Sequence, residues 1–160
     1  MAIEQQIRDR EIRIIAKNRK ALHDFFVLQS IEAGIVLQGT EVKSLRAGKV
    51  SLQDAYAMFP NSYNNEIYLI NMHIAPYEQG NIYNHEPKRK RKLLLNEREA
   101  KKLKIAVQEK GLTLIPLSIY FSGRFVKVEL GLVRAKKKYD KREDTKKKDM
   151  EKEIRKKFKY

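Results

Sequence analysis

Residues 112–133 read LTLIPLSIYFSGRFVKVELGLV and carry the clearest fold signal in the sequence. Two apolar segments, 112–121 and 125–133, flank Ser-Gly-Arg, a composition typical of the loop of a β-hairpin. In the second segment Val and Leu alternate with polar residues such as Glu129, so we predict one buried face and one wet face. Pro116 cannot donate a ladder hydrogen bond, and it therefore predicts an edge position or a bulge in the first strand.

Further strands are predicted on the N-terminal side of this hairpin, where β-branched and aromatic residues cluster between turn residues. Gly34 marks a turn between the first two of them, and a proline ends each of the last two. The polar residues 77–92 predict a long loop, and the glycine-bounded residues 39–48 predict a short helical turn. The predicted strands are 25–31, 34–37, 54–59 and 66–75.

One helix is predicted directly before the hairpin. Asn96 is a favourable N-cap with Glu99 three positions on, as in a capping box, and Gly111 occupies the usual C′ position. Leu103 and Val107 give the segment an apolar side. One helix among short strands, with connections too short for βαβ crossovers, favours a small closed or partly closed antiparallel barrel. The strand count alone leaves an OB-fold and an SH3-like barrel open.

The composition indicates a polyanionic partner. The 160 residues fit one domain and hold 35 Lys and Arg against 20 Asp and Glu, a formal charge of +15. No apolar run reaches the ~18–20 residues of a membrane span, and we see no signal-peptide h-region at the N-terminus. The absence of cysteine excludes disulfides, and three histidines far apart do not suggest a metal site. We therefore expect a cytoplasmic nucleic-acid binder with no cofactor and no membrane partner.

The positive charge divides the chain at about residue 133. Residues 134–160 hold 14 Lys and Arg against 6 Asp and Glu, a net charge of +8, without Gly or Pro. Such a segment cannot bury enough apolar surface to order itself alone. We predict an RNA-binding barrel over 1–133 and a basic tail over 134–160, disordered in the free protein and helical on a partner. The apolar face of that helix would consist of Met150, Ile154 and Phe158, which recur every four residues.

A run of cations in the predicted long loop is the first candidate RNA contact. Each phosphate that such a side chain neutralises releases counterion, although a solvated loop is the simpler interpretation. In Leu93–Leu95, which follow, we expect two side chains in the core and one at the rim, packed on a base or ribose. Residues 18–23, with the amide of Asn18 and the guanidinium of Arg19, suit RNA, but an ordinary helix start explains them equally. The cations are Lys88, Arg89, Lys90, Arg91 and Lys92.

Enzyme chemistry has little support in the sequence. The acidic residues Glu32, Glu41, Asp54 and Glu129 could form an acid/base pair, but nothing in their spacing singles out two of them. The sequence contains no P-loop, no dinucleotide-binding turn and no nucleophile elbow. A binding protein is therefore favoured over a catalyst.

Several stretches together resemble the small protein B family, the SsrA-binding proteins that partner tmRNA in bacterial ribosome rescue. The similarity extends from about residue 17 to the end, and residues 1–16 carry no motif. The stretches are NRKALHDFF (18–26), EAGIVLQGTEVKSLRAGKVSLQDAYA (32–57), HIAPYEQGNIYNHEPKRKRKLLLNERE (73–99), EKGLTLIPLSIYF (109–121) and KKYDKRED (137–144).

This resemblance implies a mainly β chain, an OB-fold barrel with flanking helices, and no enzymatic activity. It also implies binding to the tRNA-like domain of tmRNA, chiefly around its D-loop, and delivery of alanyl-tmRNA to a stalled ribosome. An elongation factor carrying GTP is a further implied partner, and we expect a monomer. The alternatives are another translation-associated OB protein and an RNA-processing enzyme.

The resemblance also implies roles for individual residues. A carboxylate such as Glu32 can accept from base amino groups, and the ring of Tyr139 can stack on a base. Ala135 stands where the family usually has Gly, which bears on the flexibility of the joint before the tail. The residues that fall where the family contacts tmRNA are Asn18, Glu32, Leu93, Leu94 and Leu95, with Lys136 and Lys137 matching its basic pair. The residues that match the segment entering the decoding centre of the small ribosomal subunit, ahead of the mRNA path, are Tyr139, Asp140, Lys141 and Arg142.

Overall fold

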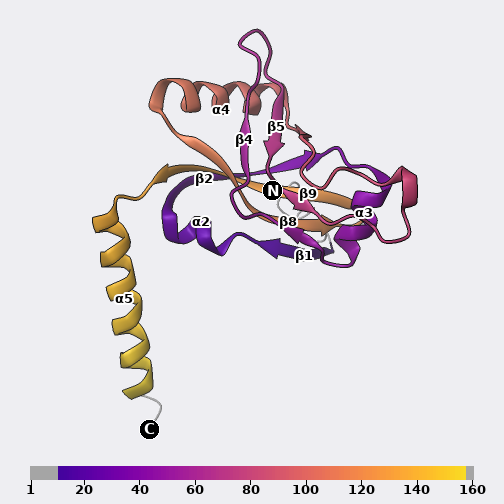
Figure 1. Ribbon diagram of the computed structural model, residues 1–160. Helices are drawn as coiled ribbons and strands as arrows, with labels where there is room; N and C mark the ends of the chain where they lie inside the picture. Colours follow the sequence, from indigo (N-terminus) through magenta and orange to yellow (C-terminus); the bar gives the residue numbers. More distant parts are fainter. Residues whose placement is uncertain (1–10, 158–160) are drawn as a thin grey trace.

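The computed structural model describes residues 11–157, and most of the body is β-structure with helices around it (Figure 1). The helices are α2 (Arg19–Asp24), α3 (Gly39–Arg46), α4 (Glu97–Lys110) and α5 (Lys138–Lys157), with one 3₁₀ turn, η1 (Asn81–Tyr83). The strands are β1 (Ile12–Lys17), β2 (Phe25–Ile35), β3 (Val50–Ser51), β4 (Tyr56–Met58), β5 (Ile67–Ile70), β6 (His73–Ile74), β7 (Arg91–Leu94), β8 (Thr113–Ser122) and β9 (Phe125–Ala135).

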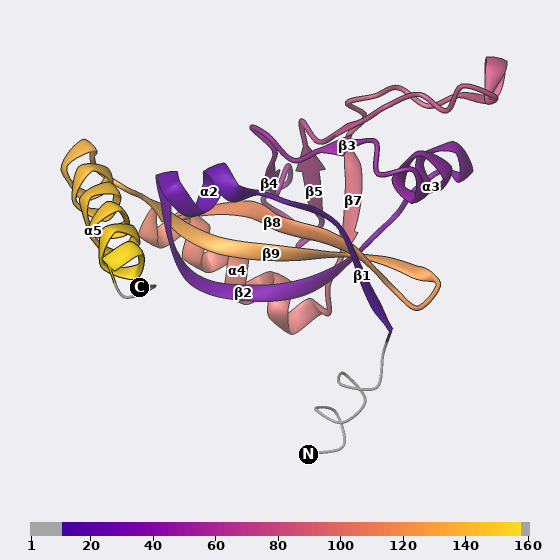
Figure 2. The same ribbon diagram turned by 90° about the horizontal axis from the view of Figure 1, so that it is seen from below.

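Six of these strands form a closed ring of neighbours. The order is β8, β4, β5, β7, β2 and β9, and β9 pairs with β8 again to close the ring. Every pairing is antiparallel. β1 lies outside the ring, beside the C-terminal half of β8, while Leu114 at the other end of β8 pairs with β4 (Figure 2). The predicted fold class, mainly β with flanking helices and OB-like, is confirmed.

The hairpin predicted from residues 112–133 is β8 and β9. Gly123, in the turn between them, has a φ of 60°, a conformation that glycine adopts without strain. The pairing of β8 with β9 shifts register between Pro116 and Ser118, which is the predicted bulge. Val128 and Leu130 are fully buried inside the ring, whereas Glu129 is half-buried outside it. The predicted register of β9 is therefore confirmed.

Helix α4 has the predicted ends. The side chain of Asn96 accepts the N–H of Glu99 at 2.9 Å, and Gly111 ends the helix with a φ of 62°. Ala100 and Leu103 are buried, and Leu103 belongs to the core cluster inside the ring. The capped helix thus covers one opening of the ring with its apolar side.

The structure differs from the sequence prediction in four places. β2 runs unbroken from Phe25 to Ile35, so Gly34 lies within a strand and not in a turn. The strand predicted at 66–75 is divided into β5 and β6 by Asn71, whose φ of 66° breaks the extended backbone. The predicted long loop 77–92 ends in β7, and β1 was not predicted at all. For β1, β2 and β7, pairing with a distant strand, which local composition does not record, determines the element.

Helix α5 extends away from the ring (Figure 1) and is exposed along most of its length. It begins at Lys138, so the residues matched to the decoding-centre segment form its first turns. Disorder of this tail in the free protein stays a prediction. In the described part of the chain, no helix is long and apolar enough to cross a membrane.

Candidate nucleic-acid interface

The run of five cations does not form one surface, because β7 begins within it. Lys88 and Lys90 are exposed, whereas the side chain of Arg91 is fully buried. Arg91 donates from Nη1 to the carbonyl of Met72 at 2.6 Å, from Nη2 to the carbonyl of Pro87 at 3.0 Å, and from Nε to Glu41. The sequence prediction that Arg91 contacts RNA phosphate is therefore wrong. Alternation along the strand turns its side chain inward.

The carboxylate of Glu41 accepts hydrogen bonds from both arginines of this run. One carboxylate oxygen accepts from Arg89 at 2.6 Å and from the N–H of Gln38 at 2.8 Å, and the other accepts from Arg91. Burial alone would raise the pKa of the Glu41 carboxyl, but the hydrogen bonds from Arg89, Gln38 and Arg91 hold that pKa below its ordinary value. Burial lowers the pKa of the Arg91 guanidinium, and Glu41 opposes this. The cluster fixes the base of the loop from which Lys88 and Lys90 project.

Two of the three leucines after the cations pack inward and one lies at the rim, as predicted. Leu93 is buried and Leu95 packs partly against the core, but the side chain of Leu94 is 51% exposed. Leu94 pairs with Gly34 of β2 across the ladder. A Cβ at position 34 would lie 3.2 Å from Cβ of Leu94, so Gly34 gives this leucine its room. The exposed leucine and the neighbouring Glu32 thus share one outer surface of β2 and β7.

Glu32 is fixed on that surface by a hydrogen bond. Its carboxylate accepts the hydroxyl of Tyr120, which comes from β8 across the intervening β9. Glu32 is itself exposed, although Tyr120 is buried. An exposed carboxylate is an acceptor of the kind that can bind a base amino group.

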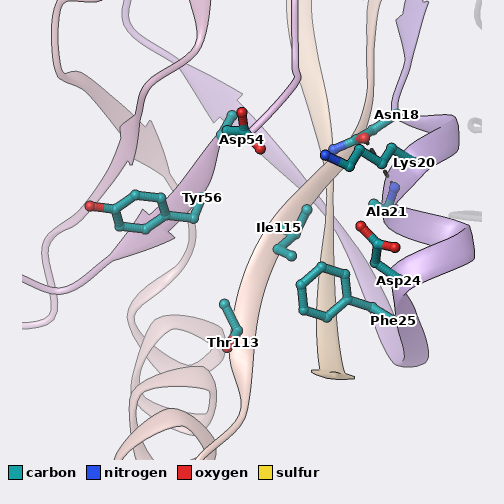
Figure 3. A pocket seen from close by; sticks show the side chains of 10 residues that line it. Asn18, Lys20, Ala21, Asp24, Phe25, Asp54, Tyr56, Thr113 and Ile115 are labelled. Carbon is teal, nitrogen blue, oxygen red and sulfur yellow. Dashed lines mark hydrogen bonds between the residues drawn. The ribbon is translucent and has the colours of Figure 1, made fainter. Parts of the chain in front are cut away.

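Asn18 has a structural role at a second location (Figure 3). Its Oδ1 accepts the N–H of Ala21 at 3.2 Å as the N-cap of α2, and its Nδ2 donates to the carbonyl of Pro116 at 3.0 Å. Asn18 is only 8% exposed, so it acts as the start of a helix, which was the alternative to RNA contact. Arg19, the next residue, is exposed on α2. The adjoining hollow, about 350 Å³, has the carboxylates of Asp24 and Asp54 in its lining. We infer that Asn18 positions α2 against β8.

The first residue of the basic pair, Lys136, lies against α2. Lys136 donates from its backbone N–H to the carbonyl of Asp24 at 2.9 Å, and its ammonium forms an ion pair with Asp144. The hydrogen bond from Lys136 lowers the pKa of the Asp144 carboxyl. Lys141 forms an ion pair with Asp24 at 3.2 Å. Lys137 is exposed, and Ala135 is paired with Phe25 as the last residue of β9. The joint between β9 and the tail, where Ala135 replaces the glycine usual in the family, is therefore held by strand pairing and by the ion pairs of Lys136 and Lys141.

The predicted apolar side of the tail is exposed. Met150 is 63% and Ile154 50% exposed, while Phe158 lies outside the described residues. Tyr139 is 71% exposed and Arg142 is exposed, whereas Asp140 accepts the N–H of Lys137 at 3.2 Å. The hydrogen bond of Asp140 is to Lys137, next to the tail, and that of Glu32 is to Tyr120 of β8, so neither bond joins the two regions. The tail and the β2–β7 surface are two separate candidate surfaces.

One feature of the interface was not predicted. Lys104 of α4 is buried and donates to three backbone carbonyls of the β4–β5 loop, whose Tyr63 is 84% exposed. A signal was present, because Lys104 lies one position after Leu103 and four after Ala100, on the helix side that packs inward. Charge alone suggested a solvated residue.

The model of the SmpB protein family matches residues 15–160. The chain belongs to the SmpB protein family. It is 58% identical over 144 residues to an SsrA-binding protein of Acetivibrio thermocellus, covering 90% of this chain and 92% of that protein. It is 52% identical over 148 residues to an SsrA-binding protein of Halothermothrix orenii, covering 92% and 94%.

A solved member of the family has the same fold. A chain from the structure called "tmRNA-SmpB: a journey to the center of the bacterial ribosome" is 51% identical, with a TM-score of 0.64, covering 80% of this chain and 92% of that chain. The family resemblance expected from the sequence motifs is confirmed. Among residues 11–157, no three His, Cys, Asp or Glu side chains gather as metal ligands would.

Proposed function

We propose that this protein binds the tRNA-like domain of tmRNA and delivers it to stalled ribosomes for trans-translation. The observation that carries the proposal is the 51% identity to a chain of a solved tmRNA-SmpB complex over 80% of this sequence. The charge of +15 is consistent with an RNA partner. The exposed Glu32 and Leu94 supply specific contacts on the β2–β7 surface, and Lys88 and Lys90 supply phosphate contacts beside it.

In this proposal the protein acts as an adaptor without enzymatic activity. The basic α5, beginning with Tyr139–Arg142, enters the decoding centre, and its charges meet ribosomal RNA along the mRNA path. An elongation factor carrying GTP binds the alanyl-tmRNA complex. The protein works as a cytoplasmic monomer in which the body binds tmRNA and the basic tail engages the ribosome. Because β9 continues to Ala135, the body extends slightly beyond the predicted boundary at residue 133.

The test is the identity of the RNA that co-purifies with the tagged protein from its bacterial host. We expect tmRNA to be strongly enriched, and a broad mixture of RNAs would contradict the proposal. Leu94→Ser is the site variant, and Ile105→Ser on α4, an aliphatic side chain of similar exposure, is its control. Loss of tmRNA with the first variant and retention with the second would assign the recovery to the β2–β7 surface.

A further inference from the structure

The β4–β5 loop is held in place by a buried lysine. The Nζ of Lys104 donates to the carbonyl oxygens of Asn61 at 2.9 Å, Ser62 at 3.0 Å and Asn64 at 2.5 Å. An ammonium group has three donors, and here each has an acceptor in the same short loop. Burying a charged side chain is costly unless it is fully hydrogen-bonded. The arrangement therefore specifies one conformation of the loop, which rises beside α4 (Figure 1).

Tyr63 lies between the loop carbonyls that Lys104 holds, yet its side chain is 84% exposed. It lines a hollow of about 520 Å³ whose other wall includes Leu94, the exposed leucine of β7. A loop fixed by a buried cation thus presents an aromatic ring to the same space as the rim leucine. An aromatic and an aliphatic side chain of this kind provide the surfaces on which an unstacked base can pack.

The lining of the hollow also includes polar and charged side chains, and its charges argue against a phosphate. Glu97 accepts from the side-chain amide of Asn65 at 2.6 Å, and Glu66 forms an ion pair with Lys92 at 3.6 Å. The two carboxylates and the one lysine leave a net negative charge in the lining, which repels an anion such as phosphate. Amide and carboxylate groups can instead hydrogen-bond the edge of a base.

We propose that this hollow takes an unpaired base of the bound RNA, stacked on Tyr63 and packed against Leu94. Lys104 is the positioning residue that holds Tyr63 in place. This inference rests on the proposed function, because it assigns one contact of the same RNA. The sugar and phosphate of the flipped nucleotide stay outside the hollow, toward the exposed Arg98 and Lys101 of α4.

The test uses the full chain and a transcript of the tRNA-like domain of tmRNA. Since the protein has no tryptophan, Tyr63→Trp places a single tryptophan fluorophore in the β4–β5 loop. We expect its fluorescence to be strongly quenched when the transcript binds. Tyr83→Trp, at an equally exposed tyrosine of η1, is the control and should change little. Unchanged emission of Tyr63→Trp at saturating transcript would overturn the inference.

Affinity provides the second readout. A base stacked on an aromatic ring is worth ~1–3 kcal/mol, so Tyr63→Ala should weaken binding roughly 5- to 150-fold, and Tyr63→Phe should restore most of it. When Lys104→Met is added to Tyr63→Trp, the transcript should no longer quench the fluorescence. The far-ultraviolet circular dichroism spectrum of this double variant should remain native. Binding of Tyr63→Ala within twofold of the unaltered chain would contradict the stacked base. Failure of the unaltered chain to bind the transcript would overturn the proposed function, and the inference with it.

Discussion

Glu41 and Arg91 form a fully buried ion pair that joins α3 to β7 across a separation of 50 residues. Further hydrogen bonds surround the pair. Arg91 donates to the carbonyls of Met72 and Pro87, and Arg89 donates to the second carboxylate oxygen of Glu41. Desolvating two charges is expensive, and only such complete pairing offsets it. The cluster therefore anchors the loop that ends at β7.

Replacing Arg91 should destabilise the fold and not merely weaken RNA binding. Arg91→Met leaves the Glu41 carboxylate buried with one arginine in place of two, and breaking a buried pair costs about 3–5 kcal/mol. Lys90→Met, at the exposed neighbour, should change the free energy of unfolding by less than about 0.5 kcal/mol. Urea unfolding of the two variants provides the comparison. Equal stabilities would show that the arginine cluster does not support the fold.

Acid should weaken this anchor. A carboxyl whose pKa is lower in the folded protein stabilises the fold above its unfolded pKa of ~4.3, and the stabilisation is lost as pH falls through the lower folded value. The pKa of Glu41 is lowered in this way. The urea midpoint of the parent should therefore fall more steeply below about pH 4 than that of Glu41→Gln, which has no proton to gain there. Parallel curves for the two proteins would argue against the assignment.

The hairpin core offers a sharp contrast between neighbouring residues. Val128 and Leu130 are fully buried, so Val128→Ala should cost about 1–2 kcal/mol and Leu130→Ala about 2–5 kcal/mol. Glu129 accepts the hydroxyl of Ser118 at 3.0 Å outside the ring, and Glu129→Gln keeps an acceptor there, so its cost should stay near 0.5 kcal/mol. A denaturant midpoint more sensitive to Glu129 than to Leu130 would contradict the register.

Local sequence patterns predicted the parts of the fold that local chemistry determines. The caps of α4 at Asn96 and Gly111, the alternation of β9 and the bulge at Pro116 each depend on a few adjacent residues. β1 and the continuous β2 were missed because their strand partners are distant in sequence. The burial of Arg91 was missed for the same reason. Its acceptors, Glu41 and the Met72 carbonyl, lie in segments that no local pattern connects to β7.

The candidate site divides in the same way. The motifs placed Glu32 and Leu94 on RNA, and the structure brings both to one surface of β2 and β7. The motif match at Asn18 gave no indication that its amide is used as a helix cap and a tether to Pro116. Lys104 and Tyr63 carry no motif, and only their contacts show that the β4–β5 loop belongs beside Leu94.

The salt dependence of RNA binding should separate the exposed cations from the specific contacts. If Lys88 and Lys90 contact phosphate as proposed, replacing both with Ala should make the slope of log affinity against log salt shallower by about 2. Glu32→Ala should weaken binding of the tRNA-like domain with the slope nearly unchanged, because a carboxylate neutralises no phosphate. Filter binding at four salt concentrations measures both. Equal slope changes in the two variants would remove the distinction between positioning and recognition.

Removal of the tail should separate tmRNA binding from ribosome function. The chain should be truncated after Lys137. Arg134 and Ala135 pair with β2, and the N–H of Lys136 donates to the carbonyl of Asp24. Truncation after residue 133 would therefore remove part of the ring. The truncated chain should bind the tRNA-like domain within a few-fold of the parent, since the β2–β7 surface stays complete. Peptide tagging on stalled ribosomes in vitro should be lost.

The same assay can test whether the tail acts through its shape or only through its charge. Ile154→Asp places a carboxylate on the side of α5 that carries Met150, and Thr145→Asp makes the same charge change on another side of the helix. If the apolar side packs against the wall of the mRNA path, Ile154→Asp should reduce tagging at least tenfold, with Thr145→Asp close to the parent. Both should keep their affinity for the tRNA-like domain, because both residues lie on α5 and not on the strands that carry Glu32 and Leu94. Normal tagging by the truncated chain would contradict the proposed role of the tail on the ribosome. Equal losses from the two aspartates would show that α5 contributes only its positive charge.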